Sequence, residues 1–324
     1  MTHSTTQEVP ARRRRHEKYD RLIAAAQARA RLTVAVAHPC DESSLGAALE
    51  AADLGLIDPI LVGPRPRIAA AAASCGRDLA ALRIVEAAHS HDSAARAVAL
   101  VKAGEAGALM KGSLHTDELM GAVVRREGGL RTARRLSHCF VMDVPSHDDP
   151  LIVTDAAINI APTLEEKRDI VQNAIDLAHA FGVEVVRVAI VSAMETVNPK
   201  VPSTIDAAAL CKMADRGQIT GAVLDGPLAL DNAIDLGAAA IKKIRSAVAG
   251  RANVLIVPDL EAGNMLAKSL TFLADADAAG IVLGARVPII LTSRADSRLT
   301  RLASCAVASL FAASHRAARP LPEA

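Results

Sequence analysis

The sequence predicts an α/β fold in which mainly parallel sheets are flanked by helices. From residue 32 onward, short runs rich in Val and Ile alternate with alanine-rich amphipathic stretches, and the alternation continues to the end of the chain. This strand-helix rhythm is typical of parallel sheets covered by helices. At 324 residues the chain also exceeds the usual size of one hydrophobic core. We therefore expect two domains with a cleft between them.

The first part of the chain contains four expected strands with helices between them. The strands are residues 32–39, 58–63, 82–87 and 106–112, and residues 93–104 have a helical pattern. Gly63, Gly104 and Gly112 stand at the ends of these segments, where glycine favours a helix end or a tight turn.

The pattern changes between residues 136 and 155. Two adjacent strand-like runs, LSHCFVMDVP and PLIVTDAA, are joined by the polar residues 146–149, which predicts a hairpin at the start of the second domain. A helix follows over residues 162–182, with Pro162 and Thr163 at its start and Gly182 at its end.

Further strands are expected over residues 186–193, 221–227 and 252–259, followed by the pair 280–284 and 287–293. Each of them ends in a polar or glycine-containing segment that leads to a helix. In parallel α/β sheets, ligands bind beyond the carboxyl ends of the strands. The junctions that follow these strands are therefore the candidate positions for a site.

The composition excludes several function classes. The 37 basic residues nearly cancel the 36 acidic ones, and aromatic residues make up only 2% of the chain, so we expect no nucleic-acid partner. No apolar run approaches the roughly 20 residues that a membrane span needs, so we expect no membrane association. Five scattered cysteines without a CxxC pair predict reduced thiols, a cytoplasmic protein and no metal site.

Common nucleotide and hydrolase motifs are absent from the sequence. Neither GxxxxGK[ST] nor a GxGxxG after a strand occurs, and there is no GxSxG or HExxH. The sequence therefore gives no sign of a bound nucleotide cofactor or of a zinc hydrolase.

The segment ILTSRADS, residues 290–297, predicts an anion site. Ser293, Arg294 and Asp296 follow an expected strand and precede an expected helix, where backbone N–H groups already favour a bound anion. A structural alternative is that Ser293 or Asp296 caps the helix while Arg294 pairs with a surface acid.

Other strand ends carry polar residues of the same kind. In each case a role as helix cap, turn former or surface residue is the alternative to substrate binding. The fourth strand ends in Lys111 and Gly112, with Ser113 and Thr116 as expected caps of the next helix; the later junctions contain Asn159, Glu195, Asp225, Gly226, Asp259 and Asn264.

These strings together resemble the phosphate acetyl/butyryltransferase family between about residues 32 and 310. The similarity is greatest to the butyryltransferase branch, and especially to the transferase portion that is fused to an enoyl-CoA hydratase-like domain in some bacteria. The segments that carry it are MKGSLHTDEL, GLRT, SHCFVMDVP, TDAAINIAPTLEEKRDIVQNA, VNPKVPSTIDAA, LDGPLALDNAI, PDLEAGNMLAKSLTF and GARVPIILTSRADS.

The resemblance implies an arrangement similar to isocitrate and isopropylmalate dehydrogenases, with an active-site cleft between two α/β domains. It implies a first domain of residues 1–144 plus 292–324, a second of residues 145–291, and a homodimer. We also expect residues 1–20 to form a flexible tail.

The resemblance further implies that phosphate attacks the thioester of acyl-CoA directly, with CoA and phosphate as substrates and no cofactor. Ser293 would stabilise the departing thiolate, Arg294 would hold phosphate or the carbonyl, and Asp296 would be the base. The family commonly has an arginine where Gly121 stands, so Arg131, Arg125 or Arg134 are the candidates to replace it. The remaining expected substrate-binding residues are Lys111, Gly112, Thr116, Asn159, Glu195, Asp225, Gly226, Asp259 and Asn264.

Two other functions stay open at this stage. One is a CoA-binding regulatory or scaffolding relative without turnover, which the glycine at position 121 and the position of Asp296 both suggest. The other is a metal-dependent decarboxylating dehydrogenase with a similar two-domain architecture, although no dinucleotide-binding motif supports it.

Overall fold

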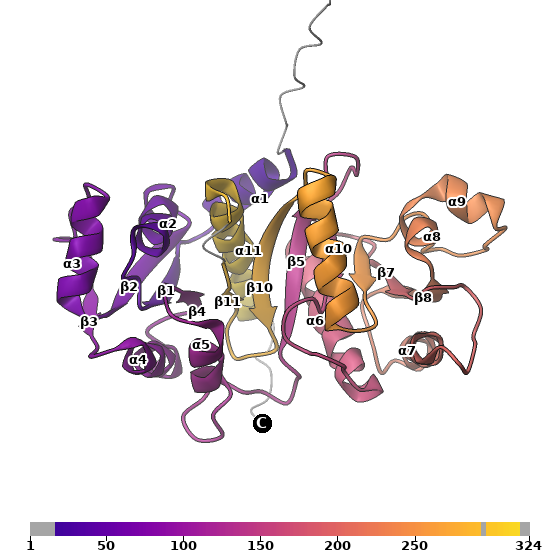
Figure 1. Ribbon diagram of the computed structural model, residues 1–324, viewed down its shortest axis with the longest axis horizontal. Coiled ribbons are helices and arrows are strands. Elements are labelled where there is room, and N and C mark those ends of the chain that lie inside the picture. The colour runs from indigo at the N-terminus through magenta and orange to yellow at the C-terminus, as the bar shows by residue number, and fades with distance from the viewer. Residues whose placement is uncertain (1–16, 293–295, 318–324) are drawn as a thin grey trace, which may run out of the picture.

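The computed structural model describes residues 17–292 and 296–317, which form one sheet with helices packed against it (Figure 1). The described residues contribute eleven strands, in the order β3-β2-β1-β4-β11-β10-β5-β6-β9-β7-β8 across the sheet. The strands are β1 (Leu32–Ala37), β2 (Ile57–Gly63), β3 (Ile84–Glu86), β4 (Ala108–Lys111), β5 (Ser137–Asp143), β6 (Leu151–Thr154), β7 (Arg187–Val191), β8 (Val223–Leu228), β9 (Val254–Ile256), β10 (Asp277–Leu283) and β11 (Ile289–Ile290).

The prediction of an α/β fold is confirmed, and every expected strand is present. Most neighbouring strands are parallel, but the pairs β11–β10, β10–β5 and β5–β6 are antiparallel. The hairpin predicted between residues 136 and 155 is the pair β5–β6, in which Met142 lies opposite Leu151. Since the sheet runs without a break from β3 to β8, a division into two domains stays a prediction.

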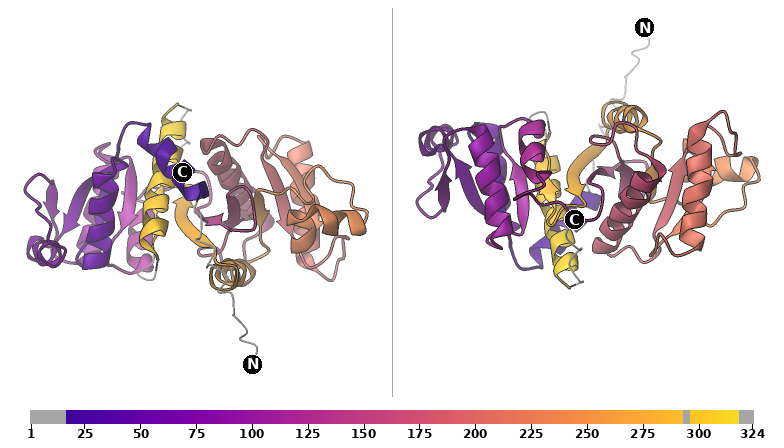
Figure 2. Two further views of the ribbon diagram at one scale, coloured as in Figure 1. Left: turned by 90° about the horizontal axis from the view of Figure 1, so that it is seen from above. Right: turned by 90° about the horizontal axis from the view of Figure 1, so that it is seen from below.

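Helices cover both sides of the sheet (Figure 2). Seen from above and below, α11 crosses the middle of the molecule between the N-terminal half and the later strands. The helices are α1 (Glu17–Gln27), α2 (Glu42–Asp53), α3 (Arg65–Ser74), α4 (Ser90–Lys102), α5 (Thr116–Val123), α6 (Leu164–Ala180), α7 (Pro202–Asp215), α8 (Leu230–Ile234), α9 (Leu236–Ile241), α10 (Leu260–Leu273) and α11 (Arg298–Ala317).

The two faces of the sheet are packed differently. Because side chains along a strand alternate between faces, β1 directs Val34 and Val36 to one side and Ala35 and Ala37 to the other. The first side has one continuous core shared by α1, α2, α6 and α11. The second side has two separate cores, one beneath α4 and α5 and the other beneath α8 and α10. The helices on the second side therefore form two groups, divided between α5 and α10.

Local sequence signals set the limits of α6. Thr163 is its N-cap: the Thr163 hydroxyl accepts a hydrogen bond from Glu166 N at 3.3 Å, and Thr163 N donates to the Glu166 carboxylate at 2.9 Å. The helix ends before Gly182, whose φ of +80° is a conformation that glycine adopts readily. Both limits agree with the predicted helix over residues 162–182.

The start of α5 differs from the prediction. Its N-cap is His115, whose backbone N–H donates to the Glu118 carboxylate at 2.8 Å. Ser113 is used elsewhere, since its hydroxyl donates to His38 O at 2.8 Å, and Thr116 is the exposed first residue of the helix. Neither Ser113 nor Thr116 is therefore the N-cap of this helix, so the prediction that they cap it is wrong.

The prediction of a flexible tail over residues 1–20 is wrong for its last four residues, which belong to a helix. Helix α1 begins at Glu17, and Lys18 and Tyr19 are buried against β5 and β10. Helix α11 packs against α1 and β10 and also contacts α2 and α6, so it lies between the two halves of the molecule, and its place in the first domain stays a prediction. Residues 1–16 lie outside the described part of the chain.

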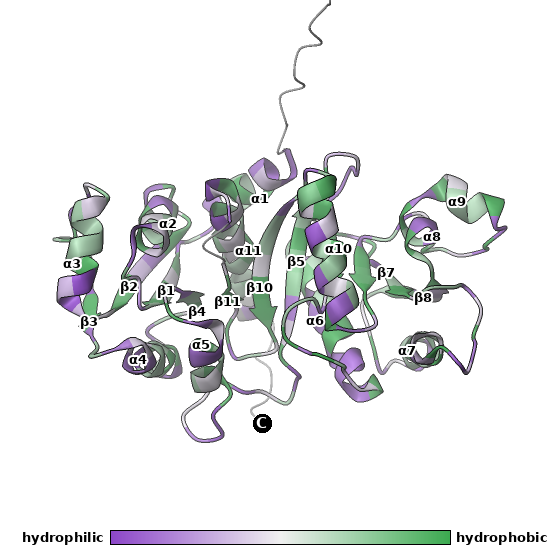
Figure 3. Cartoon of the chain, viewed as in Figure 1, coloured by the Kyte–Doolittle hydropathy of each residue, from purple (hydrophilic) through white to green (hydrophobic). Residues whose placement is uncertain are grey.

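The hydropathy of the chain matches this packing. The central strands are mostly hydrophobic, whereas the helices carry hydrophilic residues along part of their surface (Figure 3). Among the helices of the described residues, none combines the length and the apolar character that a membrane span requires.

Candidate active site

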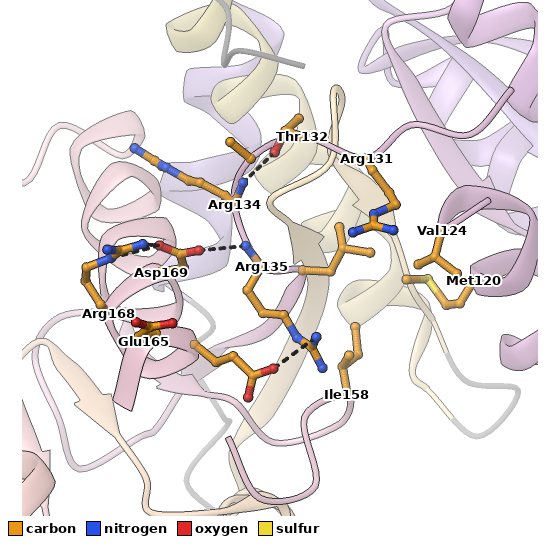
Figure 4. Close-up of a pocket in the computed structure, with 13 residues that line it drawn as sticks. Met120, Val124, Arg131, Thr132, Arg134, Arg135, Ile158, Glu165, Arg168 and Asp169 are labelled. Atoms are coloured by element: carbon orange, nitrogen blue, oxygen red, sulfur yellow. Dashed lines mark hydrogen bonds and ion pairs between the residues drawn. The ribbon is translucent and has the colours of Figure 1, made fainter. Parts of the chain in front are cut away.

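A pocket of about 660 Å³ lies between α5 and the start of α6, and we call it the α5–α6 pocket (Figure 4). Its floor is the segment that leads into β5. The lining residues are Met120, Val124, Arg131, Thr132, Ala133, Arg134, Arg135, Leu136, Ile158, Glu165, Glu166, Arg168 and Asp169. Four arginines and three acids therefore meet in one cavity beside several apolar side chains.

Acidic residues of α6 hold Arg135 in place. The Arg135 guanidinium lies 3.0 Å from the Glu166 carboxylate, and Arg135 N donates to Asp169 Oδ2 at 2.9 Å. Asp169 also pairs with Arg168 at 2.9 Å (Figure 4). Arg134 pairs with Asp176, which lies about two helical turns after Asp169 in α6. Three of the four arginines are thus already paired with carboxylates.

Arg131 differs from the other three arginines. Its side chain is exposed and points toward α5, near Met120 and Val124 (Figure 4). It makes no ion pair or hydrogen bond with any residue that the structure describes. Its backbone is held by a β-bridge to Ala285, and the next residue, Thr132, donates its hydroxyl to Gly284 O at 2.6 Å. Arg131 is therefore a cation of this pocket whose backbone is held in place and whose side chain is available to an anionic ligand.

Asn159 contacts two of the residues that line the pocket, Arg135 and Leu136. Its Oδ1 accepts a hydrogen bond from Arg135 Nε at 2.7 Å, and its Nδ2 donates to Leu136 O at 2.8 Å and Asp155 Oδ2 at 2.5 Å. Only 2% of Asn159 is exposed, and all of its side-chain groups are used within the protein. This geometry suits a residue that positions Arg135 better than one that touches a ligand.

Within the described residues, no cluster of three His, Cys, Asp or Glu side chains is arranged to hold a metal ion.

Comparison with known proteins establishes the family. Residues 86–309 match the family model described as phosphate acetyl/butaryl transferase. The chain belongs to this family. It is 68% identical over 302 residues to a phosphate acetyltransferase of Rhizobium meliloti, covering 93% of this chain and 96% of the relative.

Two further relatives support the same assignment. A phosphate butyryltransferase of Clostridium acetobutylicum is 42% identical over 296 residues, which is 91% of this chain and 98% of the relative. The crystal structure of a branched-chain phosphotransacylase from Enterococcus faecalis superposes with a TM-score of 0.76 at 30% identity, covering 87% of this chain and 99% of that one. The prediction of a phosphate acetyltransferase- or butyryltransferase-type enzyme is confirmed.

The end of β4 lies beside β11 in this member of the phosphate acetyl/butaryl transferase family. Met110 is opposite Ile290, so Lys111 and Gly112 border the point where the chain continues from β11 toward residue 293. Gly112 N donates to Ala37 O at 2.9 Å, and a Cβ at Gly112 would lie 2.3 Å from that oxygen. Lys111 is half-buried and its Nζ contacts Gly112 O at 3.4 Å. The close approach of the backbone at residues 37 and 38 explains why glycine stands at position 112.

The segment predicted to be catalytic lies only partly in the described chain. Ser293 and Arg294 fall outside the residues that the structure describes, so their roles stay predictions. Asp296 is half-buried just before α11. The cap of α11 is Ser297, whose hydroxyl accepts a hydrogen bond from Thr300 N at 3.1 Å, so Asp296 does not cap this helix.

Five other expected binding residues have structural roles away from the α5–α6 pocket. Glu195 accepts hydrogen bonds from Asn232 at 2.5 Å and Lys242 at 2.6 Å. Asp225 accepts a hydrogen bond from the N–H of Gly226 at 2.8 Å, and a Cβ at Gly226 would lie 2.7 Å from Ile190 O.

Asp259 and Asn264 are likewise used within the protein. Asp259 is the N-cap of α10, accepting from Ala262 N at 2.9 Å, and Asn264 donates to Ala156 O at 3.3 Å. None of the expected residues from β7, β8, β9 or α10 is among those that line the α5–α6 pocket. The contacts give each of these residues a structural role, and their roles in substrate binding stay predictions.

The antiparallel strands β10 and β5 explain this separation. The strand direction reverses in the middle of the sheet. The carboxyl ends of β4 and β11 therefore point to one side of the molecule, and those of β6, β7 and β9 point to the opposite side. Expecting all strand ends to form one site is valid only for a wholly parallel sheet. Lys111, at the end of β4, and Asp259, after the end of β9, therefore lie at opposite ends of the strands.

Sequence reasoning found Arg131 and Arg134 but missed Arg135 and the acids of α6. Glu165, Glu166, Arg168 and Asp169 look like ordinary charges in the first turns of a helix. The available signal was the dense run of arginines over residues 131–135 beside a helix that begins with paired acids.

Proposed function

We propose that this chain transfers a short acyl group between CoA and inorganic phosphate, interconverting acyl-CoA plus phosphate with acyl phosphate plus CoA. The observation that carries the proposal is the α5–α6 pocket, where Arg131 has no partner among the described residues, in a chain of this transferase family. Both substrates are anions, and an arginine without a carboxylate partner can bind either of them.

The proposed reaction is direct and forms no covalent acyl-enzyme. A phosphate oxygen attacks the thioester carbonyl carbon, the carbon–sulfur bond breaks, and the CoA thiolate leaves with the bonding electrons. In this scheme Asp296 receives the phosphate proton, Ser293 donates a hydrogen bond to the departing thiolate, and Arg294 offsets charge on the phosphate or the carbonyl oxygen. No cofactor is needed in this scheme, because the thioester already activates the acyl carbon for attack.

The α5–α6 pocket supports the binding of anionic substrate groups in this scheme. It lies before the start of β5, whereas Asp296 lies near the end of that strand, so the roles of Ser293, Arg294 and Asp296 rest on the family resemblance alone. Charge grows on phosphate, carbonyl oxygen and sulfur in the transition state, and fixed cations stabilise it without having to reorganise. The contacts from Asn159 and Glu166 hold Arg135 in one place, and the β-bridge holds the backbone of Arg131. The apolar side chains Met120 and Val124 are available to pack against the non-polar parts of an acyl-CoA.

We also propose two α/β domains separated by the cleft, a homodimer and a cytoplasmic location. The split between the α5 core and the α10 core supports the first of these. A special likeness to transferase portions fused to a hydratase-like domain stays a prediction, since the relatives above bear the names of transferases alone.

The test is a thiol-release assay with the purified chain. Acetyl-, propionyl- and butyryl-CoA are each incubated with and without phosphate, and the free CoA thiol and the acyl phosphate are both measured. We expect thiol release that depends on phosphate and equals the acyl phosphate formed. CoA binding without release from any of the three would reject the transferase proposal and favour a CoA-binding relative without turnover.

A further inference from the structure

We propose that a second cavity, the basic pocket, binds phosphoryl groups. It has a volume of about 390 Å³ and is lined by Lys102, Arg125, Arg126, Gly128, Gly129, Arg131 and Arg286. Five of these seven residues are cationic, and none is acidic. The α5–α6 pocket, by contrast, contains three carboxylates beside its arginines.

The backbone brings the basic residues together. After α5 the chain turns back on itself, so that Leu130 N donates to Val123 O at 2.8 Å. A Cβ at Gly129 would lie 2.2 Å from Arg125 O, so this turn requires glycine. The turn therefore places Arg125 and Arg126 across from Arg131.

Two further backbone contacts fix the other side of the pocket. Arg286 N donates to Leu130 O at 3.0 Å, and Arg131 forms a β-bridge with Ala285. Lys102 comes from a different element, the last turn of α4. The cationic side chains thus extend from three separate segments whose backbones are held in place, and their grouping does not depend on a bound ligand.

Four of the five cations that line this pocket have no carboxylate partner among the described residues. Lys102, Arg125, Arg126 and Arg131 make no ion pair or side-chain hydrogen bond with the residues that the structure describes. Like charges held near one another repel, and an anion placed between them removes that repulsion. Planar guanidinium groups match the oxygens of a phosphoryl group, which makes a phosphorylated ligand a better fit than a halide or a single carboxylate.

Two sources could supply these phosphoryl groups. Arg131 lines both cavities, so the basic pocket continues the α5–α6 pocket. If the proposed function holds, the phosphates at the nucleotide end of CoA bind in the basic pocket while the next part of the molecule extends through the α5–α6 pocket. The other source is free inorganic phosphate, which would bind whether or not the chain turns over acyl-CoA.

The test measures binding by calorimetry with three probes: CoA, 3′-dephospho-CoA and inorganic phosphate. The main variant is the double substitution Arg125→Ala and Arg126→Ala, since these residues line the basic pocket but not the α5–α6 pocket. Lys102→Ala is a second variant from a different helix. The control, Arg245→Ala with Arg251→Ala, removes two exposed arginines that line neither cavity.

We expect the double variant to bind at least one phosphorylated probe about 10-fold more weakly or worse, with a smaller effect for Lys102→Ala. Weaker binding of CoA with little change for 3′-dephospho-CoA assigns the pocket to the 3′-phosphate. An equal loss for both assigns it to the diphosphate, and a loss for inorganic phosphate alone assigns it to the free ion.

Unchanged affinity for all three probes would overturn the proposal, as would an equal loss in the control pair. Because binding is measured without turnover, the result is separate from the thiol-release assay. If the chain binds these probes but releases no thiol, the proposal of the basic pocket is supported and the proposed function is rejected.

Discussion

Lys18 and Asp143 form a buried ion pair between residues 125 positions apart in the chain. The Lys18 Nζ lies 2.8 Å from Asp143 Oδ1 and also donates to Val144 O at 3.0 Å. Both side chains are almost wholly buried, at 8% and 2% exposure. This contact fastens α1 to the end of β5, at the same edge of the sheet as Asp296 and the start of α11.

Lys18→Met should destabilise the protein by about 3–5 kcal/mol, because it leaves the Asp143 carboxylate buried without its cation. Urea denaturation followed by circular dichroism measures the change. The double variant Lys18→Met with Asp143→Leu should recover much of the loss, since neither member of the pair is then left buried without its partner. If the single and double variants were equally unstable, the ion pair would not be the cause.

Tyr19 should resist ionisation in the folded protein. Its hydroxyl donates to Val141 O and accepts from Ala279 N, both at 2.6 Å, and burial raises its pKa well above the ordinary value of 10.0. Above about pH 10 the unfolded chain loses this proton while the folded chain keeps it, so stability falls as the pH rises.

Tyr19 is the single tyrosine of the chain, and there is no tryptophan, so ultraviolet absorbance reports on it alone. We expect tyrosinate to appear together with unfolding and not before it. Tyr19→Phe should lose about 1–3 kcal/mol near neutral pH and show a flatter decline in alkali. A tyrosine that titrates near pH 10 in a fully folded protein would contradict this account.

His138 should make the protein sensitive to acid. Burial lowers its pKa from 6.5 to about 4, although the nearby Asp155 acts in the opposite direction. Between these pH values the unfolded chain binds a proton that the folded chain does not, so stability falls as the pH drops from about 6.5 toward 4.

His138→Gln should remove this contribution, which is on the order of 3 kcal/mol across that range. Denaturation midpoints of the two proteins at several pH values measure it, and titrations common to both cancel in the difference. Parallel pH profiles would show that His138 is not the group responsible.

Asn159→Ala should lower kcat/KM for acyl-CoA by about 10-fold or more, because Arg135 Nε loses the acceptor that orients it. Asn253→Ala is the matched control: Asn253 also bonds backbone, accepting from Arg187 N at 2.8 Å, but lies away from the α5–α6 pocket. Both variants should lose stability, and only Asn159→Ala should lose activity beyond that. Equal kinetics in the two variants would assign Asn159 a purely structural role.

Arg131→Ala should change stability by less than about 0.5 kcal/mol, since the side chain is exposed and has no partner in the described chain. It should nevertheless lower kcat/KM by about 10-fold or more through loss of a charged contact to substrate. Steady-state kinetics with acyl-CoA and with phosphate varied separately identify which substrate it binds. Arg245→Ala serves as the exposed control, and identical kinetics in both variants would remove Arg131 from the site.

Local patterns in the sequence predicted much of the fold. The strands, the hairpin at residues 136–155 and both limits of α6 depend on side-chain alternation, on the pairing of Thr163 with Glu166, and on Gly182. These signals act over a few residues, so they can be read without knowing where the rest of the chain lies. Even so, the cap of α5 was wrong, because Ser113 is held by His38 from another part of the sheet.

The sequence by itself determined the α/β class, the enzyme family it resembles, and the presence of arginines before β5. Only the tertiary structure decided which of those arginines has no partner. Acids of α6, more than thirty residues away, neutralise Arg134 and Arg135, whereas no described residue reaches Arg131. Strand order was equally undetermined, because the reversal at β10 and β5 arises from pairing between distant segments. Long-range contacts set both features, and they leave no periodicity in the sequence from which they could be predicted.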